Sequence, residues 1–190
     1  MRHLIVIGAG GHARSIADIV LEQGQYSLVG FVDDAYPDLE SVWEFPVFGK
    51  VDTAAGLRGM AEYAFVAIGN NKVRERLFQV LADAGFGMPN IIHPRAIVSP
   101  RAILGHGVAI MAGAVVGTEA SLGDGTIMNA GAVVDHDARV ENFGHLGVNA
   151  AMAGGSKLGR GAWMQAGSAI GYGVEVPAGR ILAPGEAIRT

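Results

Sequence analysis

The sequence predicts two parts of different fold class, a small parallel α/β domain over residues 1–92 and an all-β parallel solenoid over residues 93–190. Three observations predict this division. Short β-rich runs alternate with helical patterns as far as Ile92, and a strict period of six residues begins beyond Ile97. Glycine makes up 29 of the 190 residues, about twice its usual share, which excludes a helical bundle.

The first part combines strands and helices in alternation. Leu4–Ile7, Ser27–Val32 and Tyr63–Ile68 are the expected strands, because each is a short run rich in β-branched and aromatic residues. Gly11–Gln23 and Asn71–Ala84 are the expected helices, because their apolar residues recur at helical spacing. Strands that alternate with helices imply a Rossmann-like unit with a small parallel sheet.

The second part repeats every six residues. Fifteen successive positions at this spacing are aliphatic: Val98, Leu104, Ile110, Val116, Leu122, Met128, Val134, Val140, Leu146, Met152, Leu158, Met164, Ile170, Val176 and Leu182. A mostly small residue stands two positions before each. The period fits neither a helix nor a half-buried strand, so it predicts a solenoid whose rungs each turn one aliphatic residue inward, with three rungs in a coil of about 18 residues. A glycine-rich β-sandwich, the alternative, predicts alternation with irregular turns.

Charge and cysteine content narrow the range of possible functions. The formal net charge is −4 and the pI is about 5.8, which gives no electrostatic basis for binding nucleic acid or an anionic membrane. The chain has no cysteine, so disulfides, thiolate metal sites and cysteine nucleophiles are excluded. No export signal or membrane span is recognisable, and we expect a cytoplasmic protein.

A glycine-rich motif joins the first expected strand to the first expected helix. Gly8–Ala13 reads GAGGHA, and Asp33 and Asp34 follow about 20 residues later, at the end of the second strand. This resembles the fingerprint of NAD-binding domains, but residues 1–92 are too few for both halves of a dinucleotide fold. Glycines and a helix N-terminus stabilise any phosphate, so a single nucleotide fits better. A purely structural tight turn is the other interpretation.

His136 is the histidine with the most distinctive surroundings. It lies between Asp135 and Asp137 on a rung of the expected solenoid. A neighbouring carboxylate raises the basicity of an imidazole and fixes its tautomer, as a general base requires. An exposed histidine on a polar rung is the alternative interpretation.

Together these motifs resemble a known family. The six-residue repeat is similar to that of hexapeptide acyltransferases. It is combined with GAGGHA at Gly8–Ala13, FVDD at Phe31–Asp34 and AIGNN at Ala67–Asn71, and with IIHPRAIVSPRA at Ile91–Ala102 across the junction of the two parts. Their order resembles the sialic-acid O-acetyltransferase and nucleotide-4-amino-sugar N-acetyltransferase family (NeuD/PglD-like), over nearly the whole chain. The resemblance implies a left-handed parallel β-helix, a homotrimer with active sites between subunits, and acetyl-CoA as cosubstrate with no bound cofactor.

The resemblance also implies site residues. Those expected to bind the nucleotide sugar are Gly10, Gly11, His12, Asp33, Asp34 and Gly69. His136 is the implied catalytic base and Asp137 its partner, at a position where related enzymes commonly have glutamate, which leaves Asp135 as a possible substitute. His145 is expected to contact acetyl-CoA, and nine residues separate it from His136, so the two rings meet only across subunits.

Two small residues complete the expected acetyl-CoA site. Gly154 lies one coil of 18 residues beyond His136, so its N–H is a candidate donor to the thioester oxyanion, unless the glycine serves only a tight corner. Ala166 is expected further along the same edge, lining a groove for the pantetheine arm. A zinc site shared between subunits is the rival use of the histidines, but His136 and His145 have no third histidine within a coil, and no metal is expected.

The function that these features predict is direct transfer of an acetyl group from acetyl-CoA to the amine of a nucleotide-linked 4-amino sugar. No acyl-enzyme is implied, because no cysteine or serine adjoins His136. O-acetylation of sialic acid or another sugar hydroxyl is the alternative within the same enzyme class. A non-catalytic trimer that senses NAD or a nucleotide is the alternative from another class.

Overall fold

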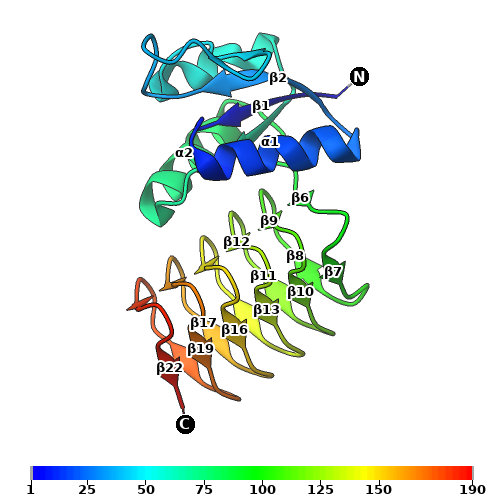
Figure 1. Cartoon of the computed structure of the whole chain (residues 1–190), viewed down its shortest axis with the longest axis vertical. Coiled ribbons are helices and arrows are strands. Elements are labelled where there is room, and N and C mark those ends of the chain that lie inside the picture. The colour runs from blue at the N-terminus through cyan, green and yellow to red at the C-terminus, as the bar shows by residue number, and fades with distance from the viewer. Residues whose placement is uncertain (1, 190) are drawn as a thin grey trace. The chain divides into compact units, whose positions relative to one another are not determined.

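The computed structural model describes residues 2–189 and divides into two compact units (Figure 1). The first unit ends at Ile91 and the second begins at Ile92, one residue before the expected boundary. The first unit is a small α/β domain and the second is a parallel β-solenoid, so both fold classes predicted from the sequence are confirmed.

The first unit is built on a three-stranded parallel sheet in the order β2-β1-β5. The strands are β1 (His3–Ile7), β2 (Ser27–Val32) and β5 (Tyr63–Val66), and the long helices are α1 (Gly11–Gln23) and α2 (Asn71–Asp83). The expected third strand ends two residues early, at Val66. Ile5, Ile7 and Val66 from the sheet pack with Leu77 and Leu81 of α2 in one buried core, which makes the sheet a rigid base for the loops at its edge.

Between β2 and β5 lie three short elements that the sequence pattern did not predict. They are the antiparallel pair β3 (Ser41–Val42) and β4 (Phe45–Pro46), and the 3₁₀ helix η1 (Val51–Gly59). Two-residue strands carry too little periodicity for a sequence pattern to reveal them.

The second unit is a stack of two-residue strands in three parallel sheets. The first sheet consists of β6 (Ile91–Ile92), β9 (Ala109–Ile110), β12 (Ile127–Met128), β15 (His145–Leu146), β18 (Trp163–Met164) and β21 (Ile181–Leu182). The second consists of β7 (Ile97–Val98), β10 (Val115–Val116), β13 (Val133–Val134), β16 (Ala151–Met152), β19 (Ala169–Ile170) and β22 (Ala187–Ile188). The third consists of β8 (Ile103–Leu104), β11 (Ser121–Leu122), β14 (Arg139–Val140), β17 (Lys157–Leu158) and β20 (Glu175–Val176).

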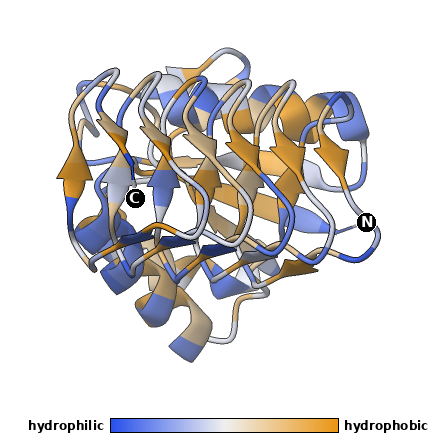
Figure 2. Ribbon diagram, turned by 90° about the horizontal axis from the view of Figure 1, so that it is seen from below, coloured by the Kyte–Doolittle hydropathy of each residue, from blue (hydrophilic) through white to orange (hydrophobic). Residues whose placement is uncertain are grey.

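Paired strands differ by 18 residues, as Val115 and Val133 do, so one coil contains three rungs as predicted. The second residue of each strand is the predicted aliphatic one, and these side chains form the core together with the small residues two positions earlier. The repeat extends one rung beyond each end of the predicted column, to Ile92 and Ile188. Figure 2 shows these strands stacked side by side, with hydrophobic residues along them.

The corners of the solenoid from residue 107 onward each contain a residue in the left-handed backbone region. From residue 107 to residue 185 this conformation recurs every six residues, and ten of the fourteen positions are glycine. The four other residues are Glu119, Asp137, Phe143 and Asn149. Because a side chain is disfavoured at positive φ, a non-glycine residue at this position calls for a specific reason.

Candidate active site

The N-terminus of α1 is exposed in the first unit. Gly10 caps the helix without a side-chain hydrogen bond, and a methyl group built on Gly10 or Gly11 meets no atom within 4 Å. The backbone N–H groups at this end are therefore accessible. A helix N-terminus with bare backbone is a favourable site for a phosphate.

Asp33 and Asp34 both hold backbone groups in the first unit. Asp33 accepts hydrogen bonds from the N–H of Ala9 at 2.7 Å and from that of Ala35 at 2.9 Å. Asp34 accepts one from the N–H of Val51 at 3.0 Å, at the start of η1. Asp33 thus fastens the end of β2 to the glycine-rich loop, a contact that sequence reasoning did not predict because its two residues lie 24 positions apart.

His12 is a neutral histidine at the start of α1. Burial is the larger cause and the charge of Arg74 the smaller, and together they lower the pKa of His12 to about 4. Its Nε2 is buried and bonds to no group within residues 2–189. A neutral imidazole can form a hydrogen bond with a ligand while the ring itself carries no positive charge.

Arg74 is a residue that the sequence analysis missed. Its side chain is 1% exposed and donates to the carbonyl oxygens of Ile68 at 2.9 Å and Gly69 at 3.1 Å, and to Oδ1 of Asn71 at 2.8 Å. Burial lowers its pKa to about 10, so the guanidinium stays charged at neutral pH. Arg74 therefore fixes the turn that contains Gly69. Its spacing of three residues from Leu77, on the buried face of α2, is the signal that could have identified it.

In the second unit His136 and Asp137 form a hydrogen-bonded pair on the corner that follows β13. Nδ1 of His136 lies 2.8 Å from Oδ2 of Asp137, and both side chains are more than half exposed. Oδ2 of Asp135 lies 3.9 Å from Nε2, on the other side of the ring. The hydrogen bond to Asp137 raises the pKa of His136, and the charge of Asp135 adds to it.

Asp137 is one of the four non-glycine residues with a left-handed backbone conformation, and its φ is 58°. This backbone directs its carboxylate to the Nδ1 edge of the ring. The bond requires Nδ1 to carry the proton, so the neutral ring presents Nε2 as its basic nitrogen.

Gly154 lies one coil beyond His136 and directly against its ring. A methyl group built on Gly154 falls 2.5 Å from Nε2 of His136, so only glycine leaves room for this ring position. The N–H of Gly155 donates to the carbonyl of His136 at 3.0 Å and ties the two coils together. Gly154 is a buried residue, and its backbone N–H donates to no acceptor within residues 2–189.

Tyr172 stands one further coil along the same column. Its side chain is 69% exposed and its ring centre lies 6.4 Å from that of His136. Sequence reasoning missed it, although the spacing 136, 154, 172 identifies it by the 18-residue coil.

His145 lies on β15, in a different sheet from the strand that precedes His136. It is 8% exposed, stacks on Trp163 with ring centres 5.2 Å apart, and pairs through Nε2 with Nδ2 of Asn129 at 2.8 Å. Asn129 and Trp163 were not predicted. They fix the plane of the His145 ring from two sides.

Ala166 corrects one expectation about the site. It lies in the turn after β18, whereas His136 and Gly154 lie in turns after β13 and β16 of another sheet. Twelve residues separate Ala166 from Gly154, which is two rungs and not a full coil of three. The expectation of one shared edge was therefore wrong, although Ala166 itself is exposed on its own corner.

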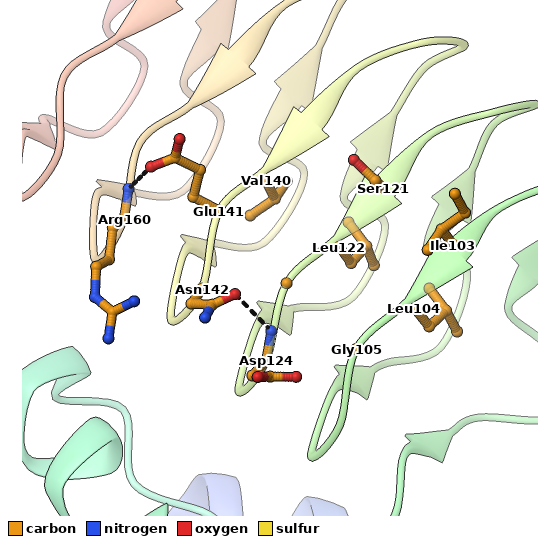
Figure 3. A pocket seen from close by; sticks show the side chains of 11 residues that line it. Ile103, Leu104, Gly105, Ser121, Leu122, Asp124, Val140, Glu141, Asn142 and Arg160 are labelled. Atoms are coloured by element: carbon orange, nitrogen blue, oxygen red, sulfur yellow. Dashed lines mark hydrogen bonds between the residues drawn. The ribbon is translucent and has the colours of Figure 1, made fainter. Parts of the chain in front are cut away.

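A surface cavity of about 500 Å³ lies along the third sheet and the turns that follow its strands (Figure 3). None of the predicted site residues lines it. Side chains bridge its successive coils: Oδ1 of Asn142 accepts from the N–H of Asp124 at 3.1 Å, and Glu141 accepts from that of Arg160 at 2.9 Å. These bonds stabilise the corner. Within residues 2–189, no group of three or more His, Cys, Asp or Glu side chains is arranged to hold a metal, and no helix is long and apolar enough to cross a membrane.

A parallel solenoid of six-residue repeats with a histidine–carboxylate pair on one corner defines the class of hexapeptide acyltransferases. The chain belongs to the PglD-like family of sugar N-acetyltransferases. Residues 3–81 match the PglD N-terminal domain. A UDP-N-acetylbacillosamine N-acetyltransferase of Bacillus subtilis is 31% identical over 114 residues, which cover 59% of this chain and about half, 52%, of that protein.

Solved structures cover more of the chain. GDP-perosamine N-acetyltransferase from Caulobacter crescentus, in complex with CoA and GDP-perosamine, is 36% identical with a TM-score of 0.93, over 99% of this chain and 89% of the other. The acetyltransferase domain of PglB from Neisseria gonorrhoeae, in complex with acetyl-CoA, is 36% identical with a TM-score of 0.79, over 100% and 96%. These comparisons confirm the predicted family and class: sugar N-acetyltransferases that use acetyl-CoA.

Proposed function

We propose that the protein transfers the acetyl group of acetyl-CoA to the amine of a nucleotide-linked 4-amino sugar. The observation that carries this proposal is the pair of His136 and Asp137, bonded at 2.8 Å, with the bare Cα of Gly154 against the ring. The relatives support it, since the Caulobacter enzyme binds CoA and GDP-perosamine and the Bacillus enzyme is named for a UDP-linked sugar.

The chemistry follows from this geometry. Nε2 of His136 takes a proton from the amine as its nitrogen attacks the thioester carbon, and Asp137 stabilises the resulting imidazolium through Nδ1. The N–H of Gly154 donates to the oxyanion of the tetrahedral intermediate. When the C–S bond breaks, the imidazolium returns the proton to the CoA thiolate. Transfer is direct, because no cysteine or serine adjoins His136 in the sequence.

The first unit supplies the nucleotide site in this proposal. The bare N-terminus of α1 at Gly10 and Gly11 receives a phosphate, and His12 offers it an uncharged hydrogen bond. Asp33 and the turn at Gly69 border the glycine-rich loop in this proposal. Each is fixed by the hydrogen bonds described above.

A homotrimer with active sites between subunits forms part of the proposal. The first residues of the strands in the second sheet face outward, and all are apolar: Ile97, Val115, Val133, Ala151, Ala169 and Ala187. The corresponding column of the third sheet contains Arg139, Lys157 and Glu175 instead. A face of apolar side chains without charges fits a second copy of the chain. Its two flanking corners hold His136 and Ala166, which neighbouring copies would bring together.

The test is a thiol-release assay with acetyl-CoA and, in parallel, a GDP-linked and a UDP-linked 4-amino sugar, with mass spectrometry of the product. One acetyl group on the amine supports the proposal, and substitution of His136 by alanine should lower kcat by about 10²- to 10⁴-fold. Turnover only with hydroxyl acceptors would favour the O-acetyltransferase. We place the reaction in the cytoplasm, in keeping with a chain without cysteine.

A further inference from the structure

Asp135 places a carboxylate at the reactive edge of His136. Its Oδ1 accepts a hydrogen bond from the backbone N–H of His136 at 2.7 Å, which fixes the side chain. Its Oδ2 then lies 3.9 Å from Nε2 and is not bonded to it. Asp137 occupies the opposite nitrogen, Nδ1. The two carboxylates therefore have different positions relative to the base, and only Asp135 faces the nitrogen that takes the proton.

The acceptor amine has a charge that this carboxylate complements. An amine beside electron-withdrawing substituents, such as an α-amino group, has a pKa of about 8, so at neutral pH most of it is ammonium. An ammonium ion has no lone pair and attacks nothing until it loses a proton. A site for this substrate therefore has to bind a cation and then deprotonate it.

We infer that Asp135 is a catalytic residue that binds the amino group of the acceptor sugar and directs it to Nε2 of His136. This inference rests on the proposed function. A nitrogen at about 2.8 Å from Oδ2 of Asp135 also reaches Nε2 at about 2.8 Å, because the two acceptors are only 3.9 Å apart. The side chain of Asp135 is 53% exposed, so an incoming amine has access to it.

The protons balance along this path. The ammonium gives its first proton to Nε2, and the imidazolium releases it to water. The neutral amine, still bonded to Asp135, attacks the thioester carbon and gives a second proton to Nε2. The C–S bond breaks, and the imidazolium returns this second proton to the CoA thiolate. One amide and one thiol form, and one proton leaves to solvent.

A purely structural role is the competing explanation, because Asp135 also caps the N–H of His136. Asp135→Asn separates the two roles, since the amide oxygen still accepts that hydrogen bond while the negative charge is lost. Asp137→Asn is the matched control, because it removes an equal charge from the other side of the same ring.

The experiment measures, by calorimetry, the Kd of two nucleotide sugars that differ only in a 4-amino or a 4-hydroxyl group, with the Kd of acetyl-CoA alongside. The parent should prefer the 4-amino sugar by about tenfold or more, as a hydrogen bond to a charged group implies. Asp135→Asn should bring this ratio close to one and leave the affinity for the 4-hydroxyl sugar and for acetyl-CoA unchanged. Asp137→Asn should retain the preference.

A preference that persists in Asp135→Asn would overturn the inference, and so would a parent that binds both sugars equally. A weaker affinity of Asp135→Asn for both sugars alike would show the structural role instead. Failure of the proposed function gives a different result. A parent without that function acetylates neither the GDP-linked nor the UDP-linked 4-amino sugar in the thiol-release assay.

Discussion

The ring of His136 lies against the bare Cα of Gly154, so that a methyl group on this glycine would fall 2.5 Å from Nε2. The two residues are 18 positions apart and therefore occupy the same column on successive coils. The position of the base thus depends on the absence of a side chain one coil away. This relationship makes the geometry of the site testable without altering any titratable group.

Gly154→Ala should lower kcat/KM by about tenfold to a hundredfold, because the added methyl displaces the ring from its position by a fraction of an ångström to an ångström. Gly171→Ala, one coil from Ala153 on the same corner, is the control, because its methyl meets its nearest atom at an ordinary 3.4 Å. Thiol release measures both variants. Equal activity of Gly154→Ala and the parent would show that the ring can move without loss.

Asp137→Asn should move the acidic limb of the kcat/KM profile to lower pH. His136 acts as a base only when neutral, so the rate falls as the pH drops through its pKa. The hydrogen bond to Asp137 is the largest cause that raises this pKa, and the charge of Asp135 is the second. Removing the first cause lowers the pKa, and a pH series of thiol release detects the shift. An unchanged profile would mean that Asp137 does not control the titration.

Asp137→Gly should stabilise the fold while it removes activity. Asp137 has φ 58° at a corner where ten of fourteen residues are glycine, and relief of this conformation should raise the free energy of unfolding by about 1 kcal/mol, or a few degrees in Tm. The lost pair with His136 is more than half exposed and subtracts little. Glu119→Gly, one coil earlier, is the control that should gain stability and keep activity. A lower Tm for Asp137→Gly would contradict the argument.

The solenoid was predictable because each rung carries its own signal. An aliphatic residue such as Val134 and a corner residue three positions later recur in every coil, so no distant contact had to be inferred. The pair of His136 and Asp137 was predictable for the same reason, because the two residues are adjacent. Gly154 followed from the length of a coil, whereas Ala166 was misplaced because its offset is not a whole coil.

The sequence pattern could not predict the contacts in the first unit. Asp33 bonds to the N–H of Ala9, and Arg74 bonds to the carbonyls of Ile68 and Gly69. Each contact joins a side chain to a backbone group on another element or turn. Their partners are set by the tertiary fold, which neither composition nor periodicity specifies.

Arg74→Lys should raise the KM for the nucleotide sugar by about tenfold and leave the KM for acetyl-CoA nearly unchanged. Lysine keeps the charge but cannot bond both carbonyls of the Gly69 turn as the guanidinium does. Arg76→Lys, on the exposed side of the same helix, is the control and should behave as the parent. Steady-state kinetics with each substrate varied gives both constants. A parallel rise in the two KM values would indicate general loosening of the fold instead.

A shared active site predicts that two inactive variants restore each other. His136→Ala and His145→Ala should each be inactive alone. If His136 of one subunit meets His145 of the next, a mixed trimer has one intact site, and random mixing at equal concentration makes three quarters of the trimers mixed. Co-refolding should therefore recover about a quarter of the parental activity, whereas each variant refolded alone recovers none. Analytical ultracentrifugation and a mass tag on one variant confirm that mixed trimers form. Mixed trimers without activity would show that each subunit builds its site alone.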